Sequence, residues 1–174
     1  MRRKRIIIPG ASYYVTARTN GGAKYLASPL AKSMLVETLA RLRARNSCRI
    51  DNFVVLDDHI HLIITPAEDS SLAATMSWLL SVYAMNYNNT FDFCGHFWES
   101  RYHSRPITGF NDLDQCFSRI DQHPVRDGLV TNEEDWEWCG LRQRSSGCRD
   151  VVEDLSQWIT LEFFESSVMV GYSQ

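Results

Sequence analysis

Residues 50–65 read IDNFVVLDDHIHLIIT. Two runs rich in β-branched residues flank the pair Asp57-Asp58, a pattern that predicts two antiparallel strands joined by a tight turn. Successive side chains of a strand point to opposite faces of its sheet, so His59 and His61 share one face and the apolar residues that alternate with them occupy the other. The hairpin is therefore expected to carry two imidazoles side by side.

Segments on either side of this hairpin complete an α+β pattern. Residues 12–18 and residues around 101–107 are expected strands. Of three expected helices, the first begins at Ser28-Pro29, the second runs from Asp69 or Ser70 to the Asn88-Asn89 break, and the third runs from Asn111 to the residue before Pro124. This order predicts a ferredoxin-like sandwich, a four-stranded antiparallel sheet with helices on one face.

Length and composition describe one ordinary globular domain. The chain has 174 residues, of which 44% are hydrophobic and 22% charged, so a disordered, collagen-like or coiled-coil chain is excluded. Apolar runs stay far below the roughly 18 residues of a membrane helix, and the N-terminal MRRKRIIIPGAS lacks the apolar region of a signal peptide. We expect a cytoplasmic protein without a membrane partner.

Charge is distributed unevenly along the chain, although the net charge is only −3. Residues 1–49 hold eleven Lys and Arg against one acid, Glu37, whereas residues 150–174 hold five acids and no base. A basic segment of this kind suits a polyanion, because neutralised phosphates release counterions; the alternative is a solvated helix face plus a loose basic tail.

Residues 1–149 are expected to form the main domain. Residues 150–174 are expected to be an acidic, helical extension, either within the same domain or appended to it.

The histidine pair is a candidate metal site. Two imidazoles on one strand face can share an ion, and the adjacent carboxylates of Asp57 and Asp58 are placed to orient an imidazole from behind. A bare His-x-His spacing also recurs by chance on protein surfaces, so spacing alone leaves both interpretations open.

The chain resembles the single-tyrosine HUH transposases, and within them the bacterial REP-associated tyrosine transposases. HUH denotes His, a hydrophobic residue and His, which His59-Ile60-His61 matches. Further segments agree in order: Pro9-Gly10 before YYVTAR (13–18), VLDDHIH (55–61), GHFWESRY (95–102) and PVRDGLV (124–130). The resemblance covers about residues 5–145 and leaves out the acidic end.

The resemblance implies a ferredoxin-like nuclease core that cuts and rejoins single-stranded DNA next to hairpins. It implies a divalent ion, Mg²⁺ or Mn²⁺, held by His59, His61 and a third ligand, which polarises the scissile phosphate. A tyrosine hydroxyl then attacks, forming a covalent 5′-phosphotyrosine. Insertion-sequence relatives act as dimers and REP-associated ones resemble monomers, so a monomer is favoured and a dimer is the alternative.

The family places its tyrosine on the third helix and the third metal ligand four residues later, in a Tyr-Ile-x-x-Asn-Pro-Val-Arg pattern. The matching residues 119–126 read RIDQHPVR. The match therefore puts His123 at the ligand position and Arg119 at the nucleophile position. A guanidinium is always protonated and cannot attack phosphorus, so the expected catalytic residue is missing.

Several interpretations of Arg119 follow. A catalytically inactive or regulatory DNA-binding protein could use Arg119 to grip the phosphate. Alternatively, Tyr102 could replace the nucleophile, although a packing or stacking role is the simpler reading. A third interpretation is a nuclease that uses the metal held by His59, His61 and His123 without a covalent intermediate.

The basic residues expected to contact the DNA backbone are Arg2, Arg3, Lys4, Arg5, Arg41, Arg43, Arg45 and Arg101.

Overall fold

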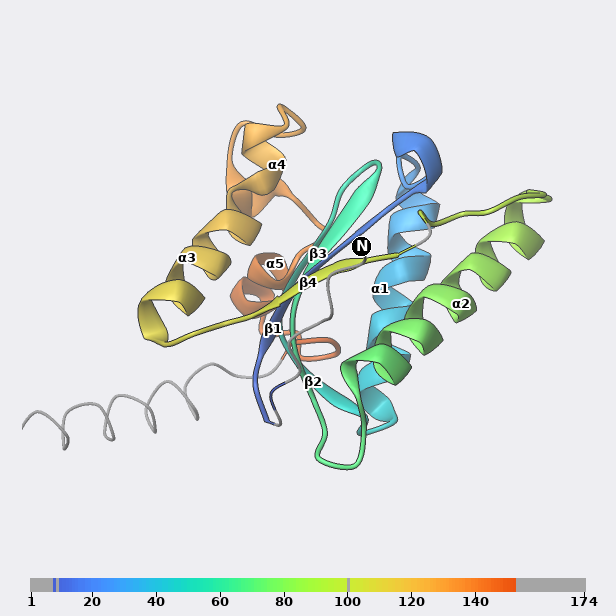
Figure 1. Cartoon of the computed structure of the whole chain (residues 1–174). Helices are drawn as coiled ribbons and strands as arrows, with labels where there is room; N and C mark the ends of the chain where they lie inside the picture. Colours follow the sequence, from blue (N-terminus) through green and yellow to red (C-terminus); the bar gives the residue numbers. More distant parts are fainter. Residues whose placement is uncertain (1–7, 9, 100, 153–174) are drawn as a thin grey trace, which may run out of the picture.

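The computed structural model describes residues 8, 10–99 and 101–152 of the chain. The strands are β1 (Tyr13–Arg18), β2 (Cys48–Val55), β3 (His59–Pro66) and β4 (His103–Pro106). The helices are α1 (Pro29–Ala44), α2 (Leu72–Phe91), α3 (Phe110–Asp121), α4 (His123–Arg126) and α5 (Gly140–Ser146), with short 3-10 turns η1 (Asn20–Gly22) and η2 (Glu133–Asp135). Figure 1 shows their arrangement.

The four strands form one sheet in the order β2-β3-β1-β4, and each neighbouring pair is antiparallel. This is the ferredoxin-like order, so the predicted α+β fold class is confirmed. The register aligns His61 with Val54 on one side and with Thr16 on the other, and Thr16 in turn with His103. The histidine-bearing end of β3 therefore lies in the middle of the sheet, between β2 and β1.

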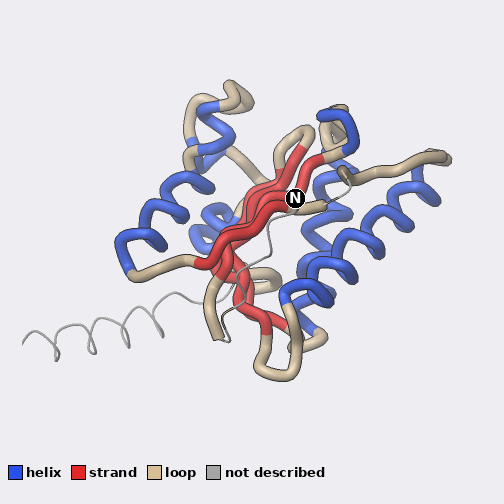
Figure 2. The backbone as a smooth tube through the Cα atoms, in the orientation of Figure 1, coloured by secondary structure: helices blue, strands red, loops and turns tan. Residues whose placement is uncertain are grey.

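Helices cover both faces of the sheet, whereas the sequence predicted helices on one face. α1 and α2 pack against one face, and α3 and α5 pack against the other (Figures 1 and 2). The reason lies in β2 and β3, whose apolar residues are continuous rather than alternating: Val54 and Ile63 are fully buried on the α3 face, as Phe53 and Leu62 are on the α1 face. A sheet that is apolar on both faces needs a cover on both.

Helix boundaries agree with the prediction at α1 and differ at α2. Ser28 caps α1, since its hydroxyl accepts the N–H of Ala31 at 3.1 Å. α2 is capped by Ser71 rather than Asp69 or Ser70, and it continues through Asn88-Asn89 to Phe91. The predicted break at these asparagines is wrong because packing outweighs their low helix propensity: the Tyr87 and Phe91 rings, one turn apart, lie 4.5 Å apart by their centroids.

The end of the third helix lies close to its predicted position. α3 stops at Asp121, and after Gln122 the short α4 begins at His123 with Pro124 in its first turn. The sequence missed α5. Residues around Cys139 pair with Val54 as an isolated bridge, which brings α5 against β2.

The C-terminal part joins the same core. Val151 and Val152 are fully buried in the α1–α2 core, and their amides donate to the Gln143 side chain. The predicted helical extension beyond them, residues 153–174, lies outside the described residues, so the boundary at 149/150 stays a prediction.

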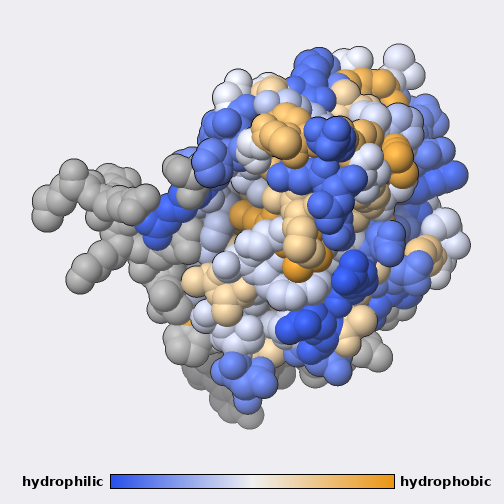
Figure 3. Space-filling view, turned by 90° about the vertical axis from the view of Figure 1, so that its right-hand side faces the viewer, coloured by the Kyte–Doolittle hydropathy of each residue, from blue (hydrophilic) through white to orange (hydrophobic). Residues whose placement is uncertain are grey.

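Within the described part, no helix has the length and apolarity needed to span a bilayer. Figure 3 shows the side on which α2 lies in Figure 1, where small groups of hydrophobic side chains alternate with hydrophilic ones. The exposed large apolar residues are scattered over several elements: Ile8, Leu30, Met85, Phe91 and Phe110.

Candidate metal centre

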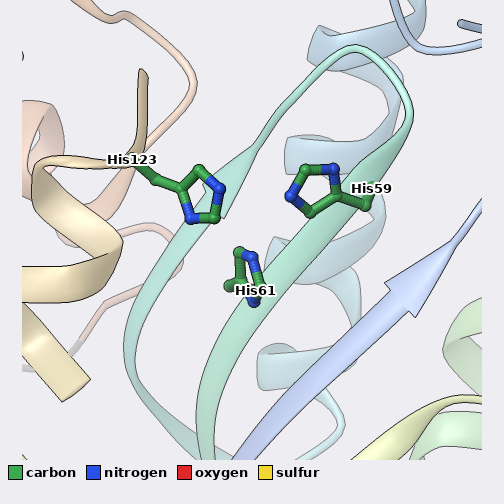
Figure 4. A group of neighbouring side chains, drawn as sticks. All are labelled: His59, His61 and His123. Atoms are coloured by element: carbon green, nitrogen blue, oxygen red, sulfur yellow. The ribbon is translucent and has the colours of Figure 1, made fainter. Parts of the chain in front are cut away.

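Three histidines meet on the α3 face of the sheet. His59 and His61 project from β3, as the strand period predicts, and His123 comes from the first position of α4 (Figure 4). One ring nitrogen from each lies within 4.8 Å of the others. We call these three residues the histidine centre.

The inward nitrogens of the histidine centre have no partner in the described structure. Nε2 of His59, Nε2 of His61 and Nδ1 of His123 are buried and form no hydrogen bond. Buried polar atoms are normally paired, and three orphaned nitrogens facing one another are the arrangement that a shared cation satisfies. The donor set therefore fits a divalent metal ion.

Each imidazole is oriented through its other nitrogen. Nδ1 of His59 lies 2.6 Å from a carboxylate oxygen of Asp58, and Nδ1 of His61 lies 3.0 Å from the Tyr14 hydroxyl. Thr16 provides a second hydroxyl at 2.9 Å from the same His61 atom. Partners of this kind fix ring orientation and tautomer in metal sites.

The third imidazole has a looser partner. Nε2 of His123 lies 3.6 Å from Asp127, one helical turn further along the chain. All of these outer partners contact the histidines from behind and leave the inward nitrogens open.

Burial disfavours the charged forms of His61 and His123. The pKa of His61 is lowered to about 2, chiefly because burial disfavours the charged imidazolium. Electrostatic repulsion between the imidazolium form of His61 and neighbouring basic side chains lowers this pKa further: His59, His123, Arg18 and Arg119. Burial also lowers the pKa of His123, although Asp127 opposes this shift. Neutral imidazole is the form that binds metal, so no proton has to be displaced from His61 at neutral pH.

A buried lysine of α1 stabilises the β2–β3 turn that carries Asp58. Lys32 of α1 is 2% exposed, and its ammonium donates to Asp57 at 2.8 Å and to the carbonyl of Ala27 at 2.9 Å. The same ammonium lies 5.3 Å and 5.2 Å from the ring centroids of Trp136 and Trp138. A paired ammonium between two indoles is stabilised despite its burial, so the turn has a rigid base.

A polar network on the same face anchors the end of α3. Asn52 of β2 donates to Asp121 at 2.9 Å, and Arg144 of α5 contacts Asp121 at 3.2 Å and Asn52 at 3.1 Å. Asp51 is the extra residue of a β-bulge, which turns the Asn52 side chain toward α3. Because Asp121 lies two residues before His123, this network positions the third histidine.

Arg119 projects beside the histidine centre. It lies one helical turn before His123, and its charge lowers the pKa of Tyr14, His61 and His123 alike. Its side chain is exposed and forms no hydrogen bond or ion pair with any residue in the described ranges. An unengaged guanidinium at this place is a ready anion ligand.

Tyr102, the predicted substitute nucleophile, lies on the wrong face of the sheet. It packs against the α1–α2 core, and its hydroxyl lies 3.4 Å from the carbonyl of Leu72 at the start of α2. Its place in the β4 segment decides this, because Ser104 aligns with Val15 of the α1–α2 face and Tyr102 lies two residues earlier. The simpler expectation, an aromatic packing residue, is the one the structure supports.

Tyr14 is the site residue that the sequence did not reveal. Its hydroxyl contacts His61, and burial raises its pKa to about 12. The available signal was the alternation of Tyr14, Thr16 and Arg18 on one face of β1; that this face is the histidine face depends on the pairing of β1 with β3.

The predicted DNA contacts fall into separate places. Arg41, Arg43 and Arg45 lie at the end of α1 next to Cys48, which pairs with Pro66 at the sheet end away from His59. Arg43 donates to the carbonyl of Arg149, and Arg45 stacks 4.9 Å from the Trp78 ring. Arg2, Arg3, Lys4 and Arg5 lie outside the described residues. Arg101 is exposed just before β4, toward the histidine end.

Other arginines, not singled out from the sequence, surround the histidine centre. Arg18 lies 3.9 Å from Asp58, and Arg105 makes two 2.8 Å contacts with Asp112 while its guanidinium lies 5.5 Å from the Tyr14 ring. Arg126 follows His123 on α4 and also lowers the pKa of that histidine. These residues form a positive rim around the three imidazoles.

Comparison with known proteins identifies the class. The family model described as "Transposase IS200 like" matches residues 9–118, more than half of the chain, so the chain belongs to the IS200-like transposase family. The match ends one residue before Arg119. The predicted recognition as a single-tyrosine transposase relative is thereby confirmed.

Two solved structures share the fold. The first is described as "Structure of the REP associates tyrosine transposase bound to a REP hairpin", with a TM-score of 0.71, 19% identity and coverage of 88% of each chain. The second, a "putative transposase" from Deinococcus radiodurans R1, has a TM-score of 0.50 and 16% identity over 70% of this chain and 97% of its own. No curated protein matches the chain in sequence.

Proposed function

We propose that this transposase-family protein binds single-stranded or hairpin DNA and holds a phosphate of that DNA at the histidine centre without attacking it from α3. The observation that carries the proposal is that, among the residues the structure describes, three converging imidazole nitrogens and the nearby guanidinium of Arg119 all lack a partner. The first group suits a divalent cation and the second suits a phosphate, so together they form a phosphate site that lacks a nucleophile on α3.

A DNA partner is supported by the neighbouring structure, whose protein is bound to a REP hairpin and covers 88% of this chain. The positive rim of Arg18, Arg105 and Arg126 is suited to backbone phosphates. All three metal-binding histidines come from one chain, which supports a monomer. The cytoplasmic location stays a prediction.

The histidines and Arg119 would have different roles at the phosphate. His59, His61 and His123 would hold Mn²⁺ or Mg²⁺, which when bound polarises the phosphate. Imidazole donors favour Mn²⁺ of the two, because Mg²⁺ prefers oxygen ligands. Arg119 binds and orients the phosphate oxygens but cannot attack phosphorus.

Tyr14 is poorly suited to replace the missing nucleophile. Its hydroxyl lies against the outer nitrogen of His61, behind the inward nitrogens, and its raised pKa opposes formation of the phenolate. We therefore assign Tyr14 to orienting His61. The function supported best is thus recognition by a transposase fold, with strand transfer through a tyrosine lost.

The direct test incubates the full chain and Mn²⁺ or Mg²⁺ with labelled single-stranded hairpin oligonucleotides from its own genomic neighbourhood. We expect a retarded complex on a native gel and no protein-linked DNA on a denaturing gel. A covalent band would show that another tyrosine attacks and would overturn the assignment of Arg119. Absence of any complex would overturn DNA recognition itself.

A restoration experiment uses Arg119→Tyr in the same assay. If α3 still presents this position to the phosphate, the variant gains a metal-dependent covalent band, and the added changes His59→Ala and His61→Ala remove it. Failure to gain the band would contradict the placement of Arg119 at the nucleophile position. Arg142→Tyr on the exposed face of α5 is the matched control and should give no band.

A further inference from the structure

Arg119 is an arginine beside the histidine centre that forms no hydrogen bond or ion pair within the described part of the chain. Arg105 is held by Asp112, Arg144 by Asp121 and Asn52, and Arg126 contacts Gln122 at 3.1 Å. Arg18 lies within 3.9 Å of Asp58. A guanidinium that keeps all of its donors open can bind two oxygens of one phosphate in a fork.

The histidine centre carries no negative charge of its own. Its three inward nitrogens belong to imidazoles, which carry no negative charge, and the carboxylates of Asp58 and Asp127 contact the outer nitrogens instead. A divalent ion held there would keep its full charge, since no carboxylate ligand offsets it. With Arg119 beside it, the site suits an anion that carries more than one negative charge.

A phosphate at the end of a DNA strand meets this requirement better than an internal one. An internal phosphodiester carries one negative charge and two unesterified oxygens. A terminal phosphomonoester, with a second pKa of about 6, is mostly a dianion at neutral pH and offers three strong acceptor oxygens. Three oxygens suffice for one contact to a cation and two to the guanidinium fork.

Access to the histidine centre favours the same ligand. His59 and His61 are 5% and 6% exposed, so a phosphate has to fit between neighbouring side chains to approach their inward nitrogens. A terminal phosphate has one bulky substituent, whereas an internal diester carries a nucleotide on each side. The end of a strand therefore enters with less steric conflict.

We propose that the histidine centre and Arg119 together form a binding site for the terminal phosphate of a DNA strand. This inference rests on the proposed function and specifies its ligand: an end that already carries a phosphate is held without a covalent bond. The preference resides in Arg119 and not in the general positive rim.

The test measures binding of the full chain by fluorescence anisotropy to one single-stranded sequence in three forms, with a 5′-phosphate, a 3′-phosphate or hydroxyls at both ends. Measurements are made with Mn²⁺ and with EDTA. We expect one phosphorylated form to bind about ten- to a hundredfold more tightly than the hydroxyl form in Mn²⁺, the range of one charged hydrogen-bonding contact. The two phosphorylated forms identify which strand end is recognised.

Two variants locate the preference. Arg119→Gln should bind the three forms alike, whereas Arg142→Gln, an equally exposed arginine on α5, should keep the wild-type ratio. Because Arg119 is exposed, its replacement should leave the melting temperature unchanged, which is checked alongside.

The outcomes separate the two proposals. Equal binding of all three forms by the wild type would overturn the end-phosphate site and leave DNA recognition standing. A preference that persists in Arg119→Gln would also overturn it. No binding of any form would overturn both proposals.

Discussion

The carboxylate of Asp58 lies 2.6 Å from Nδ1 of His59, directly behind the ring nitrogen that faces the other histidines. Its chain neighbour Asp57 is paired with the buried Lys32. One tight turn thus connects the ion pair of Asp57 and Lys32 with the orientation of a buried imidazole in the histidine centre. The turn is therefore part of the site as well as part of the hairpin.

Removal of the β3 histidines should abolish metal binding. A metal that binds only the folded chain stabilises it by about 2.7 kcal/mol at a hundred times its dissociation constant. We expect Mn²⁺ to raise the melting temperature of the wild type and of His96→Ala, an exposed loop histidine, but not of the variant with both His59→Ala and His61→Ala. Equal thermal shifts in all three proteins would refute the metal site.

Asp58→Asn should weaken metal binding without unfolding the protein. The amide keeps the shape of the side chain but loses the charge that orients His59, and changes of this type cost about 10- to 100-fold in metal affinity. Calorimetric titration with Mn²⁺ measures the difference. Asp69→Asn, an exposed residue before α2, is the matched control, and an Asp58→Asn affinity equal to that of the control would count against an orienting role.

Arg144→Met should destabilise the fold and disturb His123 together. The change leaves the partly buried Asp121 with Asn52 as its remaining side-chain partner in the described structure, and breaking a buried pair from one side costs up to about 3 kcal/mol. Urea unfolding measures the loss, with Arg142→Met as the exposed control on the same helix. A loss below about 1 kcal/mol, typical of a surface pair, would show that the network does not anchor α3.

Gly140→Ala should be destabilising because its methyl group has no room. The added carbon would overlap Oδ1 of Asn52 and lie 3.0 Å from Nη1 of Arg144 and 3.1 Å from Val152. Overpacking of this type costs about 1–3 kcal/mol. Asn52→Ala opens the space, so the double variant measured by urea unfolding should show a smaller added cost of Gly140→Ala; full additivity would contradict the clash.

Acid should destabilise the metal-free protein through His61. Its pKa is about 2 in the folded chain and near 6.5 when unfolded, so the unfolded chain takes up a proton that the folded chain excludes. The contribution is fully present above about pH 6.5 and is lost as pH falls toward 2, at up to about 1.4 kcal/mol per pH unit. His61→Gln should therefore show a shallower decline in urea unfolding measured in EDTA, and parallel declines would exclude His61 as the cause.

Local periodicity accounts for much of the agreement between sequence and structure. The β-branched runs around Asp57-Asp58 form the hairpin, the strand period of two sets His59 and His61 on one face, and Ser28-Pro29 begins α1. These features depend on neighbours within a few residues, so the sequence expresses them directly. Resemblance, rather than periodicity, singled out His123 and Arg119.

Contacts between distant segments decided the rest. The pairing of β1 with β3 brings Tyr14 and Thr16 to His61, and the continuous apolar runs of β2 and β3 draw α3 and α5 onto the second face. Helix propensity predicted a break at Asn88-Asn89 that aromatic packing overrides. Likewise, the direction of α1 places Arg41, Arg43 and Arg45 at the end of the sheet opposite the histidine centre, and their role as DNA contacts stays a prediction.

The sequence by itself determined the order of the four strands and of the first three helices, the two-histidine face and the absence of a tyrosine at position 119, because each is a property of residues close together in the chain. Only the tertiary structure decided that His123 completes the centre, that Asp58, Tyr14 and Thr16 orient its rings, and that Arg119 stays unengaged beside it within the described residues. The physical reason is that strand register and helix docking are set by burial of apolar residues far apart in sequence, which no local pattern encodes.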